Sequence, residues 1–277
     1  MKLEQLFQPP QAIPSIPQVL QELIVALGDE ASQPLALARL IEHDATISAR
    51  LLQLANSAFF SPGREIHTVS QALDQLGTVN VRSVVIGLGL KSRFNTLENA
   101  VLQPFWRNSL RIAATAQHWA ALPEVQLNVH HAWTVGLLYT IGQLFMHMGL
   151  PQDMQALDAQ MEPLAPERIA LEREKFGFGY PEVSAELVRR WRLPALFHEV
   201  LSVEPWQPAA TELTPMAALV QMAVRQVWVY APAAAEQRSD LPWPAEVAAL
   251  VPLQPEQAAE SFPGWQPLCG KLEAMLD

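Results

Sequence analysis

The run Leu137-Leu138-Tyr139-Thr140-Ile141-Gly142-Gln143-Leu144 lies within residues 132–150, a stretch that contains no Asp, Glu, Lys or Arg. The stretch is nearly long enough to cross a bilayer, but polar and small residues such as Thr134 and His147 interrupt it. Its apolar residues recur at helical spacing, at Leu137, Ile141, Leu144, Phe145 and Met148. The pattern predicts one buried core helix over residues 132–148.

The remaining periodic segments also have the helical period, and no alternating run is bounded by Asn-Gly or Asp-Gly turns. Prolines separate these segments, because a proline cannot continue a preceding helix but can begin the next one. The sequence therefore predicts an all-α protein. Helices are expected near residues 17–27, 34–43, 45–56, 68–76, 78–94, 166–176, 181–192, 195–202 and 215–230, with a second group of helices beginning at Pro104.

Composition restricts the class of protein. The 277 residues are 50% hydrophobic and carry a formal charge of -10, with nine Lys/Arg against eighteen Asp/Glu in residues 151–277. This acidity disfavours binding to the phosphate backbone of nucleic acids. The single cysteine, Cys269, excludes an internal disulfide, and residues 1–11 do not resemble a signal peptide, so we expect a cytoplasmic protein without a membrane association.

A second signature, LIEHDATISARLLQLANSAFF, occupies residues 40–60. It follows IPSIP at residues 13–17 and precedes ALDQLG at residues 72–77. In this order the three segments resemble the HDOD domain, the HD-related output domain of bacterial signalling proteins. The resemblance covers residues 12–230 and implies an N-terminal HDOD-type helical subdomain (12–95) and an HD-like helical subdomain (96–230). Residues 231–277 are interpreted as a linker followed by a C-terminal helical appendix.

HD enzymes hold a divalent metal ion with one His, a His-Asp pair and a later Asp. In this chain the resemblance places Asn108, Tyr139, Thr140 and Val224 at those four positions. An amide, a phenol, a hydroxyl and an alkyl group do not form a divalent metal site, so no metal and no cofactor are expected. The dipeptide His43-Asp44 is read as a helix-end pair, because the Ile-Gly frame that follows the family's ligand pair is absent there.

The resemblance implies a non-catalytic signal-transduction module that acts through protein–protein contacts. Response regulators and cyclic-nucleotide signalling enzymes are the partners expected by analogy. One candidate ligand or partner cleft lies between the subdomains, lined by the degenerate positions and by two further drifted positions, Gly179 and Tyr180. A second interpretation is that Tyr139 and its neighbours fill the vacated volume. The other candidate partner surface comprises Asp44, Arg50, Asn56 and Ser57, where Asn56 could instead satisfy backbone groups at a helix end.

Two alternatives remain open. A phosphohydrolase-like protein that retains nucleotide or phosphoester binding would need His118, His147 or His198 close to two carboxylates. Nucleic-acid binding would have to use the basic stretch 82–111, where Arg82, Lys91, Arg93, Arg107 and Arg111 face only Glu98. A helix-turn-helix at residues 34–60 is disfavoured because its basic and acidic residues balance.

Overall fold

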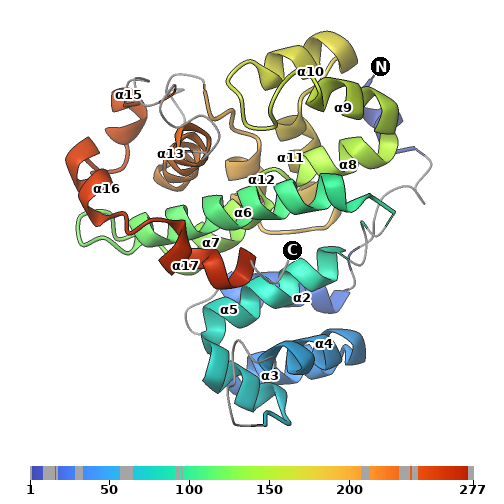
Figure 1. Cartoon of the computed structure of the whole chain (residues 1–277), viewed down its shortest axis with the longest axis vertical. Helices are drawn as coiled ribbons and strands as arrows, with labels where there is room; N and C mark the ends of the chain where they lie inside the picture. The colour runs from blue at the N-terminus through green and yellow to red at the C-terminus, as the bar shows by residue number, and fades with distance from the viewer. Residues whose placement is uncertain are drawn as a thin grey trace. The chain divides into compact units, whose positions relative to one another are not determined.

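The computed structural model describes residues 2–8, 16, 18–28, 34–56, 65–91, 94, 96–206, 213–230, 238 and 243–273. These residues form helices and no strand, which confirms the all-α prediction (Figure 1). The helices are α1 (Leu3–Leu6), α2 (Gln18–Gly28), α3 (Pro34–Glu42), α4 (Ala45–Ala55), α5 (Val69–Lys91), α6 (Asn99–Ala120), α7 (Val129–Leu138), α8 (Ile141–Gly149), α9 (Pro151–Asp158), α10 (Arg168–Phe176), α11 (Tyr180–Arg190), α12 (Ala195–Leu201), α13 (Pro215–Val229), α15 (Ala245–Ala248), α16 (Pro255–Ser261) and α17 (Trp265–Glu273).

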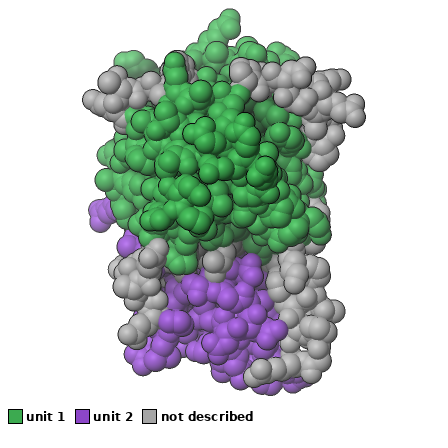
Figure 2. Space-filling model, turned by 90° about the vertical axis from the view of Figure 1, so that its left-hand side faces the viewer, with its two compact units in different colours: residues 1–13, 97–190, 194–277 green, residues 14–96, 191–193 purple. Residues whose placement is uncertain are grey.

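The chain divides into two compact units, coloured separately in Figure 2. Unit 2 comprises Pro14–Thr96 and Trp191–Leu193, and unit 1 comprises Met1–Ile13, Leu97–Arg190 and Pro194–Asp277. The C-terminal residues therefore belong to the same unit as α6 to α11. Most of the linker predicted at 231–244 falls outside the described residues.

In unit 2, α2, α3 and α4 all pack against α5. Fully buried Leu20, Ile41 and Leu51 contribute to this core. Gly77 has a φ of 77° and breaks α5 into two segments, at the point where the sequence predicts one helix to end and the next to begin. At Gly89 a Cβ would lie 2.6 Å from the Leu20 side chain, so this glycine permits close packing of α5 on α2.

The ends of α3 and α4 confirm the reading of His43-Asp44 as a helix-end pair. Asp44 Oδ1 accepts a hydrogen bond from the Ile47 backbone N–H at 3.0 Å and so caps the start of α4. His43 follows the last residue of α3, and its side chain is exposed.

In unit 1, α6 packs against α7, α13 and α17. The three fully buried tryptophans Trp106, Trp119 and Trp133 come from α6 and α7. Helix α17 is held on α6 by a bidentate ion pair between Arg111 and Glu273, whose N–O distances are 2.7 and 3.1 Å. The indole N–H of Trp265 adds a hydrogen bond to Thr115 Oγ1 at 3.1 Å.

Two predicted boundaries are wrong. Helix α6 begins at Asn99, five residues before Pro104, which lies inside the helix. The proline is tolerated because Ala100, whose carbonyl loses its helical partner, is exposed and can be solvated. The single helix predicted over residues 132–148 is in fact two helices, α7 and α8, which are separated at Tyr139 and Thr140. No described helix is both long enough and apolar enough to cross a membrane.

Candidate functional site

The break between α7 and α8 places Tyr139 and Thr140, the residues that the family resemblance assigns to the His-Asp pair, at a helix junction. Thr140, with φ -97° and ψ 14°, is the N-cap residue of α8. The hydroxyl of Ser184, on α11, accepts a hydrogen bond from the Gly142 N–H at 2.9 Å and donates one to the Tyr139 carbonyl at 3.2 Å. Ser184 therefore bridges the two ends of the junction from a neighbouring helix.

The phenol of Tyr139 is fully engaged inside unit 1. Tyr139 is 1% exposed, and its hydroxyl donates a hydrogen bond to the Val203 carbonyl. Its ring meets the ring of Tyr180 edge-on, with centroids 6.2 Å apart. Burial, with a further contribution from the charge of Glu204, raises the pKa of Tyr139 far above its ordinary value. The phenol is therefore held in its neutral form in the folded chain.

Thr140 pairs with the residue next to Asn108. The hydroxyls of Thr140 and Ser109 lie 3.3 Å apart, and both residues are buried. Asn108 itself is half-buried on α6. Val224 is fully buried on α13, which packs against α6 and α7. All six degenerate or drifted positions thus fall in unit 1, and hydrogen bonds or ring contacts join Tyr139, Thr140 and Tyr180 to a common buried region.

Gly179 and Tyr180 begin α11 through backbone hydrogen bonds to carboxylates. The Tyr180 N–H donates to Glu172 at 2.8 Å, and the Gly179 N–H donates to Glu182 at 3.2 Å. A Cβ at Gly179 would lie 2.9 Å from the Ile169 side chain, so glycine allows this close approach. The Tyr180 hydroxyl is buried, with no hydrogen-bond partner of ordinary geometry among the described residues.

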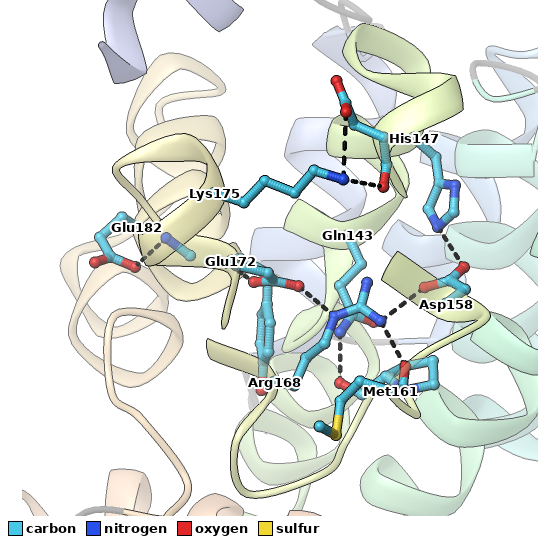
Figure 3. Close-up of polar contacts among 12 residues, drawn as sticks. Gln143, His147, Asp158, Met161, Arg168, Glu172, Lys175 and Glu182 are labelled. Carbon is cyan, nitrogen blue, oxygen red and sulfur yellow. Dashed lines mark hydrogen bonds and ion pairs between the residues drawn. The ribbon is translucent and has the colours of Figure 1, made fainter. Parts of the chain in front are cut away.

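Glu172 belongs to a buried ion network that the sequence reasoning missed (Figure 3). Arg168 Nε donates to Glu172 at 2.7 Å, and its Nη1 lies 2.7 Å from Asp158 Oδ1. Nη1 also donates to the Met161 carbonyl at 2.8 Å. His147 Nε2 is 3.0 Å from Asp158 Oδ2. Arg168 and Glu172 are 0% exposed, so the network runs from a fully buried ion pair to Asp158, whose side chain is 32% exposed.

Burial and pairing act in opposite directions on the two acids of this network. Burial alone would raise the pKa of Asp158, but its hydrogen bond to His147 and the charge of Arg168 lower it overall. For Glu172, burial outweighs the nearby Arg168 and raises the pKa. A pocket of about 190 Å³ adjoins the His147 end of the network and is lined in part by Gln143, His147 and Asp158.

The described residues contain no group of three or more His, Cys, Asp or Glu side chains that could hold a metal ion. His147 has one nearby carboxylate, and the Arg168 guanidinium lies between that carboxylate and Glu172. A ring nitrogen of His118 lies 2.7 Å from the Ser261 carbonyl, and His198 is exposed. The convergence that the phosphohydrolase alternative needs is therefore not found at any of the three histidines in the described part of the chain.

On the other candidate surface, Asp44 caps α4 and Asn56 holds backbone groups. The Asn56 side chain donates to the carbonyls of Leu52 and Ile66 at 2.9 and 2.6 Å and accepts from the Ile66 N–H at 2.7 Å. Arg50 is exposed. Ser57 lies outside the described residues.

The basic stretch 82–111 can be followed only in part. The side chains of Arg82 and Lys91 and the whole of Arg93 are outside the description. Arg111 is committed to Glu273 and also lies over the ring of Trp265, 4.7 Å from its centroid. The Arg111 side chain is therefore used inside unit 1.

Several solved structures share this fold, among them the following three. An HDOD domain protein of unknown function from Geobacter sulfurreducens is 19% identical, with a TM-score of 0.73 and coverage of 99% of this chain and 97% of that one. A protein from Marinobacter aquaeolei VT8, provisionally named a signal transduction protein, is 19% identical, with a TM-score of 0.78 and coverage of 95% and 59%. A protein from Shewanella amazonensis SB2B, provisionally named a phosphohydrolase, is 24% identical, with a TM-score of 0.69 and coverage of 98% and 97%.

Sequence comparisons agree with this similarity. An uncharacterized protein of Treponema pallidum is 25% identical over 183 residues, a match that covers 66% of this chain. The chain spans only about a third, 35%, of the length of that relative. The model of the HDOD domain matches residues 13–204, which is more than half of the chain. The chain therefore belongs to the HDOD domain family.

Proposed function

We propose that this chain is a non-catalytic module of bacterial signal transduction that acts through protein–protein contacts. The observation that carries the proposal is the chemistry at the four metal-ligand positions of HD enzymes. The family resemblance assigns Asn108, Tyr139, Thr140 and Val224 to these positions, and the last three are buried and almost without solvent access. None of the four offers an imidazole or a carboxylate, the groups that hold a divalent ion in such sites.

The surroundings of these positions also favour a structural role. The Tyr139 hydroxyl is engaged with the Val203 carbonyl, and the Thr140 hydroxyl lies within hydrogen-bonding distance of Ser109. Both oxygens are neutral hydroxyls that already take part in buried contacts, and without an imidazole or a carboxylate beside them they are weak ligands for a divalent ion. The residues therefore do not fit the ion that the fold family implies, and no reaction step is assigned to it.

The names of the structural neighbours support two classes of function. The neighbour from Marinobacter aquaeolei is provisionally named a signal transduction protein, the class that we favour. The neighbour from Shewanella amazonensis is provisionally named a phosphohydrolase. The second candidate is therefore a protein that retains phosphoester or nucleotide binding, with the pocket beside His147 as its place in unit 1. Partners proposed for the favoured class are signalling proteins, including response regulators and cyclic-nucleotide signalling enzymes.

The test has two parts, performed on the full chain purified without added metal or a histidine tag. Elemental analysis should find no stoichiometric Mn, Fe, Ni or Zn, and a panel of phosphodiesters and nucleotides should show no hydrolysis when these metals are supplied. Metal near one equivalent per chain together with hydrolysis would overturn the proposal. Affinity capture from lysate should then recover a signalling protein with the wild-type chain. The variant Arg50→Glu serves as the comparison and should retain less of that protein.

A further inference from the structure

A second pocket, of about 260 Å³, lies between α13 and the C-terminal segment that carries α15 and α16. Every residue that lines it follows residue 204, where the match to the HDOD domain ends. The side chains used below are Trp206, Met222, Arg225, Gln226 and Trp243. The pocket is therefore formed by the part of the chain that the family model does not cover.

The pocket uses a different face of α13 from the degenerate metal position. Met222, Arg225, Gln226 and Val229 are spaced so that they share one face of the helix. Val224 lies at least about 100° around the helix axis from each of these four residues. It is fully buried. A ligand in this pocket would accordingly be independent of the lost metal site.

Arg225 is a cation without a counter-ion among the described residues. It is half-buried, its Nε donates to the Pro205 carbonyl at 2.6 Å, and its guanidinium lies 5.1 Å from the centre of the Trp206 ring. No described carboxylate pairs with it, and burial lowers its pKa. Arg238 gives the contrast, because it stacks on Trp228 at 4.0 Å but is also paired with Glu162 at 2.8 Å. A partly desolvated charge of this kind is stabilised by any anion that reaches it.

The rest of the pocket wall combines one polar side chain with apolar groups. Trp243 contributes an aromatic side chain. Gln226 adds a side-chain amide to the wall. The rest of the lining is mainly aromatic or aliphatic, which suits the faces and edges of a ring.

We propose that this pocket binds a small aromatic anion, a molecule of one or two rings that carries a single carboxylate or phosphate group. Sites for drug-sized molecules occupy roughly 300–1,000 Å³, so a pocket below that range selects a smaller ligand. The anionic group pairs with the guanidinium of Arg225, and the ring contacts the apolar wall. The inference does not depend on the proposed signalling role, because no residue of the degenerate metal site takes part.

Isothermal titration calorimetry of the full chain tests the proposal with two probes, indole-3-acetate and phenyl phosphate, which separate the carboxylate from the phosphate. At least one should bind saturably with one site per chain. The neutral comparators are indole-3-acetamide, the isostere of indole-3-acetate, and phenol, which lacks the phosphoryl group of phenyl phosphate. Because a hydrogen bond to a charged group is stronger than one to a neutral group, each should bind about tenfold more weakly than its anionic probe, or worse. This comparison uses only the wild-type protein.

Arg225→Gln should also weaken binding of the anionic probe about tenfold or more. The matched variant Arg238→Gln removes a stacked and paired arginine and should change the Kd of the probe by no more than about twofold. Circular dichroism establishes that each variant is folded. The proposal would be overturned if neither probe saturates the protein up to about 10 mM. It would also be overturned if a probe and its neutral comparator bind equally well. Undiminished binding by folded Arg225→Gln would do the same.

Discussion

The hydroxyl of Ser184 on α11 accepts a hydrogen bond from the backbone N–H of Gly142 on α8, with Oγ and N 2.9 Å apart. The same hydroxyl donates to the Tyr139 carbonyl at 3.2 Å, so one side chain satisfies a donor and an acceptor released by the break between α7 and α8. Ser184 is fully buried. The junction at Tyr139 and Thr140 is therefore fixed by a tertiary contact.

This contact predicts that Gly142→Ala is destabilising. The new Cβ would lie 2.3 Å from the Tyr180 carbonyl oxygen and 2.7 Å from Ser184 Oγ, and α8 and α11 would have to separate. Overpacking of this kind costs about 1–3 kcal/mol in the free energy of unfolding, measured by urea denaturation. In the control Gly87→Ala, a Cβ meets nothing within 4 Å, and the helix should gain about 0.5–1 kcal/mol. Equal stability of Gly142→Ala and wild type would contradict the close approach of the two helices.

A second prediction concerns the acid dependence of the buried ion network. The pKa of Asp158 is lowered in the folded chain from an ordinary value of 3.8, so the folded state holds this carboxylate in its charged form more readily than the unfolded state does. Its contribution to stability is present above pH 3.8 and is lost as the pH falls through the lowered pKa. The difference in unfolding free energy between wild type and Asp158→Asn should therefore be largest near neutral pH and should shrink below pH 3.8.

The raised pKa of Glu172 acts in the opposite direction, favouring the folded state at low pH. Glu172 is present in both proteins of the comparison, and the charge of Asp158 is the smallest of the causes that set its pKa, so this opposing effect changes little between them. Asp153→Asn is the surface control, because the Asp153 side chain is 55% exposed and pairs with Lys175 at 3.3 Å. Its effect should stay within about 1 kcal/mol across the same pH range. A difference between wild type and Asp158→Asn that does not change with pH would show that the pairing does not hold this carboxylate.

The sequence predicted the helical class and many of the helix limits because prolines and Gly77 act locally. It failed at Tyr139 and Thr140 for a physical reason. The apolar stripe of residues 137–148 keeps its period through the break, and the side chain that stabilises the break, Ser184, comes from a helix that is distant in the sequence.

The ion network shows the same limit. Arg168 and Glu172 stand at the i,i+4 spacing that can be read from a sequence. That spacing is usual for exposed pairs and does not indicate burial. The remaining members, Asp158 and His147, belong to α9 and α8, so only the tertiary structure brings them to Arg168.

Two residues of the candidate partner surface on unit 2 differ in role, because Asn56 holds backbone groups and Arg50 is exposed. Substitutions at the two positions should therefore have different effects. Asn56→Ala removes three hydrogen bonds to Leu52 and Ile66 and should lower the unfolding free energy by about 1–3 kcal/mol. Arg50→Glu changes an exposed side chain and should alter stability by no more than about 0.5 kcal/mol. If this surface binds the partner, Arg50→Glu should nevertheless reduce its capture from lysate. Full retention of the partner by Arg50→Glu would exclude Arg50 from the interface.

Restoring the lost ligands tests the assignment of the degenerate positions directly. Tyr139→His with Thr140→Asp returns the His-Asp pair, but Asn108 and Val224 still deny two ligands, and the tight binding of a divalent ion needs all of them. Elemental analysis of the double variant after incubation with Mn or Fe should therefore find no stoichiometric metal. Adding Asn108→His and Val224→Asp completes the ligand set, and this quadruple variant should retain metal if it folds, with circular dichroism as the control. Tight, stoichiometric metal in the double variant would mean that Asn108 and Val224 are not the remaining ligand positions, because a two-residue site leaves most of the coordination shell to water.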